Sequence, residues 1–318
     1  PFSTFVFSWE LSSIGIHNFT LLHSKTFVLR VFLCILPSKS LNNTVRIPTL
    51  VESTWPENYF SLLPKIFPYK QLHSISENQK GDCSLMHQAL QTELDDLYRL
   101  WVLDEGNDKC PPKIFIFDLL RDNRKVATIN CENLFQKKLI SMELDPYSAC
   151  HSRYEMYITV KDEKNEVPGL TTRINPTYIT FLGVRKIGQF YTSDRNGNLY
   201  YGNNKMYNQT ENIESIVIRK LGVLLGEPKS LVLDLMGMLY YIVDKFGIVV
   251  RVTPYKGVLK AEEHEILYFS QSEAPLTQVI FGSMGSVWAV TSNFVAHKDH
   301  CNRILYHFML QSNTSEII

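Results

Sequence analysis

An all-β fold is predicted by three features of this sequence. Its apolar residues occur in short runs of bulky and β-branched side chains bounded by charge, such as residues 100–103 (LWVL). No apolar period of about 3.6 residues persists over a helix length with capping signals, and the nearest candidate, residues 85–97, is also compatible with a strand and a turn. A unit of one turn and one strand, finally, returns along the chain.

The returning unit is a polar turn, usually containing Asp and Gly, that is followed by an aliphatic and then an aromatic residue. Six copies end on the aromatic residues Phe32, Trp101, Tyr157, Tyr200, Tyr240 and Trp288. The later copies are roughly 40 to 56 residues apart, which is the period of a four-stranded propeller blade. We therefore predict a six-bladed β-propeller that forms a single domain over residues 1–318.

The first part of the chain contains two predicted strands. Residues 4–9 (TFVFSW) alternate, and we expect this strand to complete the last blade and close the ring so that no long edge stays exposed. Residues 27–37 (FVLRVFLCILP) are the most apolar stretch, but they are about half of the ~20 residues that a membrane span needs. We predict a buried strand there, followed over residues 38–82 by ordered loop and short strand packed on a blade.

The middle of the chain repeats the plan of strand, turn and strand. Residues 94–119 contain one strand, a turn in which Pro111 and Pro112 exclude helix, and a second strand. The pair Asn196-Gly197 is the strongest short-range hairpin signal. Further strands are predicted at residues 126–129, 142–145, 190–194, 231–235 and 239–243.

Charge and cysteine usage exclude some classes of function. Lys plus Arg and Asp plus Glu both number 32 without a basic run, so there is no electrostatic case for binding nucleic acid or an anionic membrane. The six cysteines have no CxxC pair, so structural disulfides are a better interpretation than a zinc site, and we expect neither a metal nor a cofactor. The cysteines are Cys34, Cys83, Cys110, Cys131, Cys150 and Cys301.

Secretion would make four Asn-x-Ser/Thr acceptors available for glycosylation. They are Asn18, Asn42, Asn208 and Asn313. The sequence starts at Pro1 without a charged segment that leads into an apolar one. We therefore expect any signal peptide to have been removed or to lie outside this sequence.

No catalytic constellation stands out. Residues 282–285 (GSMG) are one residue short of a nucleophile elbow, and residues 222–230 have the wrong Gly-to-Lys spacing for a phosphate loop, so we interpret both as turns. His297 and His300 are expected to be solvated in a charged loop. Acidic residues at the hairpin turns could pair as acid and base, but the turns themselves require such residues. These residues are Asp95, Asp96, Asp104 and Asp234.

Two adjacent motifs carry a family resemblance. Asp96-Leu-Tyr-Arg-Leu-Trp-Val-Leu-Asp104-x-Gly106 and Cys110-Pro-Pro-Lys-Ile-x-Ile-Phe-Asp118-Leu119 are similar to the RLWVLDxG and CPPKLxxFDL signatures of the insect yellow and major royal jelly protein family. Supporting matches are residues 7–9 (FSW), 30–32 (RVF) and 285–288 (GSVW). The resemblance implies a secreted insect protein with a six-bladed propeller. The short segment between residues 9 and 30, the unclear pattern over residues 161–177 and the additional Cys34 and Cys301 depart from the family.

The resemblance leaves three functions open. The first is the binding of a small amphipathic ligand, such as a biogenic amine or a catechol-like molecule, in the central propeller opening, a function that the resemblance associates with pigmentation. The second is conversion of dopachrome, by an isomerase or tautomerase reaction, in melanin formation. The third is a structural or nutritive extracellular role. We rank binding first, because a propeller axis supplies a concave site while no acid, base or metal set is visible.

The resemblance also suggests site residues. Alignment of residues 285–288 with salivary amine-binding relatives places Thr277 on a pocket threonine and Phe294 on a pocket aromatic residue. Ser292 falls where the family has a pocket asparagine, and Asn293 is adjacent to it. The alternative is that these are ordinary residues at strand ends. In a secreted protein, Cys83, Cys110, Cys131 and Cys150 are expected to supply at least one disulfide around the second and third blades.

Overall fold

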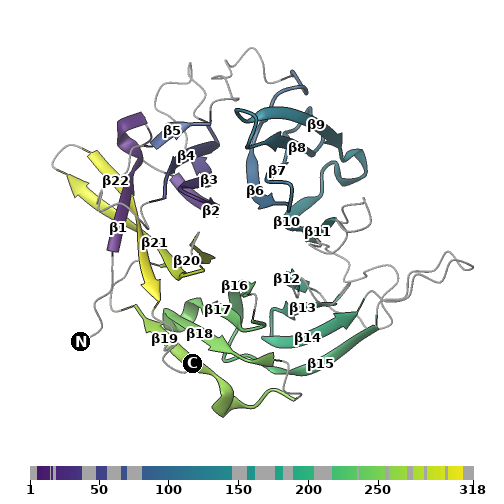
Figure 1. The fold of residues 1–318 in the computed structure, drawn as a ribbon, viewed down its shortest axis with the longest axis vertical. Coiled ribbons are helices and arrows are strands. Elements are labelled where there is room, and N and C mark those ends of the chain that lie inside the picture. The colour runs from purple at the N-terminus through teal and green to yellow at the C-terminus, as the bar shows by residue number, and fades with distance from the viewer. Residues whose placement is uncertain are drawn as a thin grey trace, which may run out of the picture. The chain divides into compact units, whose positions relative to one another are not determined.

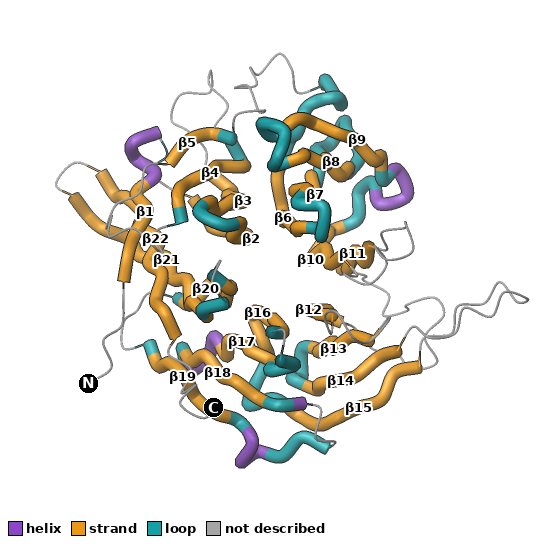
Figure 2. The backbone as a smooth tube through the Cα atoms, in the orientation of Figure 1, coloured by secondary structure: helices purple, strands orange, loops and turns teal. Residues whose placement is uncertain are grey.

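The structure, a computed structural model, describes the backbone of most of the chain. The described residues are 6–14, 16, 19–37, 48–55, 66–69, 81–144, 156–161, 176–181, 189–203, 217–234, 236–254, 258–270, 275–282, 285–297 and 300–310. They form strands and short 3₁₀ helices and no α-helix, which confirms the all-β prediction (Figure 2). Within the described part, no helix has the length and apolar character needed to cross a membrane.

The chain divides into two compact units. The first, unit 1, comprises Pro1–Gln136 and Ser270–Ile318, and the second, unit 2, comprises Lys137–Phe269. All four tryptophans lie in unit 1, at positions 9, 55, 101 and 288. Tryptophan fluorescence therefore reports on the folding of unit 1.

The described residues of unit 1 form three four-stranded antiparallel sheets (Figure 1). One has the order β2 (Phe19–Phe27), β3 (Arg30–Pro37), β4 (Leu50–Thr54) and β5 (Ile66–Pro68). The next has the order β6 (Ala89–Leu94), β7 (Arg99–Asp104), β8 (Lys113–Asp118) and β9 (Arg124–Asn130), and the 3₁₀ helix η4 (Glu132–Leu134) follows it. The third has the order β20 (Leu276–Phe281), β21 (Val287–His297), β22 (His300–Leu310) and β1 (Val6–Glu10).

The N-terminal strand β1 completes the sheet that the C-terminal strands begin. Trp9 lies opposite Leu305 in the antiparallel pair of β1 and β22, and the 3₁₀ helix η1 (Leu11–Ile14) follows β1. This pairing was expected for residues 4–9. It covers the edge of β22 that does not pair with β21.

Unit 2 contains one two-stranded and two four-stranded sheets among its described residues. β10 (Lys138–Leu144) pairs with β11 (Met156–Lys161). The second sheet has the order β12 (Pro176–Phe181), β13 (Gln189–Asp194), β14 (Asn198–Asn203) and β15 (Val217–Val223). The third has the order β16 (Pro228–Leu233), β17 (Leu239–Val243), β18 (Ile248–Val252) and β19 (Glu265–Phe269), with the 3₁₀ helices η6 (Asp244–Phe246) and η8 (Ala261–Glu263) in its connections.

The apolar cores lie between neighbouring sheets of each unit. In unit 1, the ring of Trp55 lies 5.9 Å from that of Trp9 and 5.3 Å from that of Trp288, so one core joins the sheet of β2–β5 to the sheet that contains β1 and β21. In unit 2, Tyr191 and Leu199 pack with Tyr241 and Val250 between the two four-stranded sheets. Face-to-face packing of this kind explains why the predicted strands are short and apolar.

Most strand predictions are confirmed. Residues 126–129, 190–194 and 239–243 lie in β9, β13 and β17, and residues 89–94 of the ambiguous segment form β6 rather than a helix. The apolar stretch at 27–37 is β3 from Arg30 onward, with residues 31–35 fully buried, while Phe27 ends β2. Trp101 and Trp288 are buried, as the blade assignment requires.

In three of the six copies, those of Asp95, Asp194 and Asp234, the returning turn is built by one carboxylate. Asp95 Oδ1 accepts the N–H groups of Leu97 (3.0 Å) and Arg99 (2.9 Å), while its Oδ2 accepts the indole N–H of Trp101 at 2.8 Å. Asp234 accepts the N–H groups of residues 236 and 238 and the hydroxyl of Tyr240 at 3.0 Å in the same pattern. An Asp six residues before the aromatic residue therefore fixes both the turn and the strand that follows it.

One copy of the unit lies at a different place in its sheet from the other five. Asp194 binds the turn N–H groups and the hydroxyl of Tyr200 (3.1 Å) as its counterparts do, but Tyr200 lies on β14, the third strand of its sheet. The other five aromatic residues lie on the second strand of their sheets. The turn is local, so its sequence does not reveal how many strands precede it in the sheet.

Candidate functional site

Thr277 and the other predicted ligand residues lie in two neighbouring strands. Thr277 is at a β-bulge in β20, where its hydroxyl donates to the carbonyl oxygen of Val290 at 3.0 Å. The pairing of β20 with β21 stops at Leu276, the first residue of β20, which lies opposite Thr291. Residues 292–294 of β21 therefore continue past this end of β20. Ser292, Asn293 and Phe294 pair instead with residues 305, 304 and 303 of β22. The structure therefore brings Thr277 to Val290, and a common ligand site with residues 292–294 stays a prediction.

A disulfide joins Cys83 to Cys110 in unit 1. It links the segment before β6 to the turn between β7 and β8. Cys131 and Cys34 are buried free thiols, and Cys150 lies outside the described residues. The glycosylation candidates also lie outside them, at Asn18, Asn42, Asn208 and Asn313.

Asp104 and Lys113, in the motifs at residues 96–106 and 110–119, have structural partners. The fully buried Asp104 accepts the backbone N–H groups of His87 (3.0 Å), Gln88 (2.6 Å) and Gly106 (3.2 Å), and burial raises its pKa. Lys113 is also fully buried and donates to the carbonyl oxygens of Cys83 and Leu85, while burial lowers its pKa. The motif residues thus hold the disulfide segment against β7 and β8.

His297 and His300 do not lie in the charged loop that we expected. They are the last residue of β21 and the first residue of β22, and their backbones pair with each other. Two long strands extend to this hairpin, so an extended backbone replaces the predicted loop. Within the described part of the chain, no group of three His, Cys, Asp or Glu side chains could hold a metal ion.

A polar cluster lies on the first strands of two sheets in unit 1. We call it the His23 cluster; it comprises His23 and Lys25 of β2 with Gln91, Thr92 and Glu93 of β6. Lys25 Nζ donates to Glu93 Oε2 at 2.5 Å, and Gln91 Nε2 donates to Glu93 Oε1 at 3.2 Å. His23 Nε2 lies 3.9 Å from Glu93 Oε1. Alternate residues of β2 thus meet one buried carboxylate.

The imidazole of His23 has a defined tautomer and charge. Its Nδ1 atom is 3.4 Å from the backbone N–H of Thr92, which donates to it and leaves the ring proton on Nε2, toward Glu93. Burial lowers the pKa of His23 to about 4, against the smaller opposing effect of Glu93. At neutral pH, the cluster therefore combines an uncharged imidazole, an ammonium group and a carboxyl group, which are groups that can bind an amine or move a proton.

The His23 cluster continues toward the strand that carries Thr277. Gln278 of β20 accepts the N–H and hydroxyl of Ser24 at 2.7 and 2.8 Å, and it donates to the carbonyl oxygen of Ser24 at 3.1 Å. Ser24 lies between His23 and Lys25 in β2. Hydrogen bonds therefore connect the first strands of all three sheets of unit 1.

Sequence reasoning missed the His23 cluster. Its members on β2 and β6 are about 70 residues apart, and no motif spacing joins them. The only local signal is the alternation of His23 and Lys25, which places two polar side chains on one face of a strand.

The sheets define the class of this protein, and comparisons with known proteins add limited detail. The class is an all-β protein of antiparallel sheets with a propeller-like fold. A catalytically inactive virginiamycin B lyase from Staphylococcus aureus aligns with a TM-score of 0.52 and 10% identity over 97% of this chain and 100% of that one. The WD40 β-propeller domain of Doa1 aligns with a TM-score of 0.47 and 9% identity over 94% of this chain and 95% of that one.

A match in amino-acid sequence to an enzyme covers one segment of the chain. Over 67 residues, the chain is 33% identical to the dopaminechrome tautomerase of Drosophila melanogaster. This segment is 19% of the chain and only 14% of that protein, so the chain matches a small part of its relative's length. No protein-family profile matches the chain.

Proposed function

We propose that this protein is a secreted six-bladed β-propeller related to the yellow and major royal jelly proteins, and that it binds a small amphipathic molecule, either a biogenic amine or a catechol-like compound. The observation that carries the proposal is the segment that is 33% identical to a dopaminechrome tautomerase. The paired motifs at residues 96–106 and 110–119 point to the same family.

Two structural observations support the propeller and its export. The described residues form six sheets, and β1 pairs with β22 as ring closure by the N-terminal strand requires. The disulfide between Cys83 and Cys110 is of the kind that persists in oxidising compartments, and two buried free thiols are compatible with it.

The ligand would use the first strands of unit 1. Glu93 pairs with Lys25 through Oε2, and its Oε1 can accept a protonated amine beside the Gln91 amide. Thr277 lies one residue before Gln278, which is bonded to the neighbour of His23. We propose that residues 292–294 supply further contacts, with the ring of Phe294 stacking on the ligand. Such aromatic or cation–π contacts contribute about 0.5 to 2 kcal/mol.

A second candidate function is proton transfer on a dopachrome-like substrate. The observation that favours it is the uncharged His23 imidazole beside Glu93 and Lys25, because tautomerisation needs one group that takes a proton and one that returns it. A structural or nutritive role is the third possibility and would require none of these groups.

Calorimetric titration with serotonin, dopamine and octopamine, together with a dopachrome-consumption assay, separates the three functions. Binding without turnover supports the first function, turnover supports the second, and neither supports the third. If an amine binds, Glu93→Gln should weaken it at least about tenfold, because a charge-assisted hydrogen bond contributes about 1.5 to 3 kcal/mol.

The matched control is Glu52→Gln, which removes a carboxylate from the separate ion pair with Arg30. It should leave amine affinity unchanged. Thr277→Val and Phe294→Ala should each weaken the amine without much change in stability. Unchanged affinity in both variants would remove residues 277 and 292–294 from the proposed site.

A further inference from the structure

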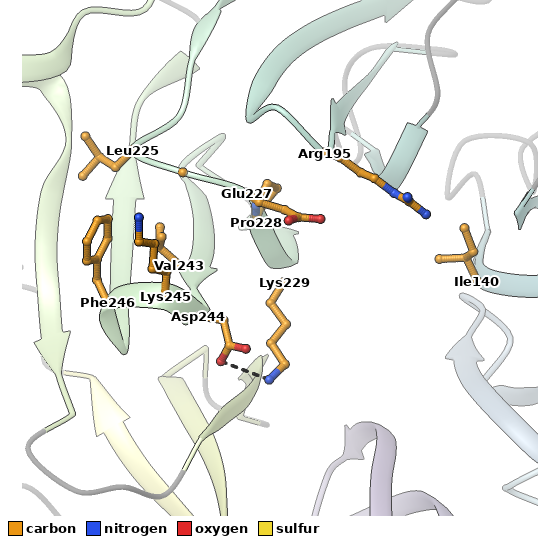
Figure 3. A pocket seen from close by; sticks show the side chains of 11 residues that line it. Ile140, Arg195, Leu225, Glu227, Pro228, Lys229, Val243, Asp244, Lys245 and Phe246 are labelled. Carbon is orange, nitrogen blue, oxygen red and sulfur yellow. Dashed lines mark hydrogen bonds and ion pairs between the residues drawn. The ribbon is translucent and has the colours of Figure 1, made fainter. Parts of the chain in front are cut away.

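A second location, in unit 2, has the form of a ligand site. A cavity of about 940 Å³ lies beside the connection from β15 to β16, and helix η6, the β13–β14 turn and Ile140 of β10 also line it (Figure 3). This volume is within the range of about 300 to 1,000 Å³ that is common for small-molecule pockets. All of its lining residues lie between positions 140 and 246, and therefore within one compact unit.

The backbone holds two walls of the cavity together. The carbonyl oxygen of Gly197, in the β13–β14 turn, accepts the N–H of Leu224 at 2.8 Å, and the N–H of Leu225 donates to the hydroxyl of Tyr241 at 3.2 Å. A Cβ atom at Gly197 would lie 2.8 Å from the carbonyl oxygen of Gly226, so this approach requires glycine. The turn that carries Arg195 is thus fixed against the wall that begins at Leu225 before any ligand arrives.

The cavity combines an apolar surface with an excess of positive charge. Pro228 and Val243 are buried in its wall, and the ring of Phe246 is half exposed. Lys229 and Asp244 form an ion pair at 3.1 Å, so they largely neutralise each other. The other charged side chains of the lining are the cations Arg195 and Lys245 and the carboxylate of Glu227. Lys245 Nζ lies 5.5 Å from the centre of the Phe246 ring.

Arg195 is the residue best placed to recognise an anion. It is exposed at the tip of the β13–β14 turn and extends across the cavity toward Ile140 (Figure 3). Among the described residues, it has no acidic partner within the 4.0 Å of an ion pair. A guanidinium group presents parallel N–H donors that match a carboxylate in bidentate geometry.

We propose that this cavity binds a small amphipathic organic anion, an aromatic carboxylate, whose acid group pairs with Arg195 and whose ring packs on Ile140 and Pro228. Glu227 repels the acid group from the wall formed by residues 225–228 and so favours one orientation. The inference does not rest on the proposed function, because it concerns an anion and uses residues of unit 2 alone.

Calorimetric titration of the full chain with indole-3-acetate tests the charge requirement, with the neutral indole-3-acetamide as a probe of the same size. We expect the acetate to bind more tightly than the amide, and the difference to shrink as salt screens the charge. Arg195→Met should weaken the acetate about tenfold or more, from the loss of about 1.5 to 3 kcal/mol of charge-assisted hydrogen bonding. Glu227→Gln should tighten it.

Matched variants separate the site from general effects. Arg219→Met removes an exposed arginine of β15 that does not line the cavity, and it should leave the acetate affinity unchanged. Ile140→Ala should weaken both probes roughly two- to tenfold, because the ring loses an apolar contact, whereas Phe246→Ala, on the other side of the cavity lining from Arg195 (Figure 3), should weaken neither.

Three results would overturn the inference. They are the absence of acetate binding at millimolar concentration, equal affinity for acetate and amide, and acetate binding that Arg195→Met leaves unchanged. Circular dichroism of each variant shows whether the fold is intact. Because Arg195 is exposed and Ile140 is only partly buried, we expect their substitution to leave the fold unchanged.

Discussion

Replacing Asp95 by Ala should destabilise unit 1 by about 3 kcal/mol, within a range of about 2 to 4. The carboxylate is 1% exposed and accepts four hydrogen bonds, two from backbone N–H groups and two from the side chains of Arg99 and Trp101. Leu97 is exposed, so water can replace the partner of its N–H at little cost. The indole N–H of Trp101 is buried, and leaving such a donor unpaired costs about 1 to 3 kcal/mol.

The remaining loss comes from the turn and from the ion pair. A side chain that caps backbone N–H groups contributes about 0.5 to 2 kcal/mol, by analogy with helix caps. The pair of Asp95 with Arg99, at 2.6 Å, adds less than a fully buried pair, because the side chain of Arg99 is 21% exposed. Asp95→Asn should cost less than Asp95→Ala, since an amide oxygen can still accept the two backbone N–H groups.

Urea unfolding followed by tryptophan fluorescence measures this loss, because all four tryptophans belong to unit 1. The control is Asp108→Ala, which removes an exposed carboxylate from the next turn and should change the free energy of unfolding by less than about 0.5 kcal/mol. If Asp95→Ala shifts the free energy by no more than this control, the turn does not depend on the carboxylate and our account of the returning unit is wrong.

Three further predictions concern unit 1. Trp101→Ala should cost about 3 to 5 kcal/mol, and an unchanged melting temperature would contradict its place in the core. Thiol counting on denatured, unreduced protein should find fewer than six thiols, and reduction of Cys83–Cys110 should cost about 2 to 4 kcal/mol of stability; six thiols would refute the disulfide. His23, with its pKa lowered to about 4, stays neutral in the folded protein, while the unfolded chain takes up a proton near pH 6.5. Stability should therefore fall as the pH drops from about 6.5 to 4, and His23→Gln should flatten this part of the profile when unfolding is measured at several pH values.

Local patterns were enough to predict the strands and their turns. Asp95 and Trp101 are six residues apart and bond to each other, so the sequence that forms the turn also contains the partners that stabilise it. The same holds for Asp234 and Tyr240. For that reason, the all-β class and most strand positions, including the N-terminal strand, could be inferred from residue type and period alone.

The position of a strand within its sheet was not available from such patterns. Tyr200 follows a turn of the same chemistry as Trp101, but lies one strand further along its sheet. The hydrogen bonds of the turn involve only residues 194–200, so they are the same whichever strand the turn precedes. Only the pairing of β12 with β13, between residues that no motif joins, decided the order.

The sequence by itself thus determined the strands, the turns and the residue types that a site could use. Tertiary structure alone decided which of those residues meet. Glu93 reaches Lys25 because β2 and β6 belong to sheets that pack together, and the turn that carries Arg195 meets the loop after β15 because Gly197 and Gly226 let the two backbones touch. Contacts between distant segments depend on how whole sheets pack, and this packing cannot be predicted from any short stretch of sequence.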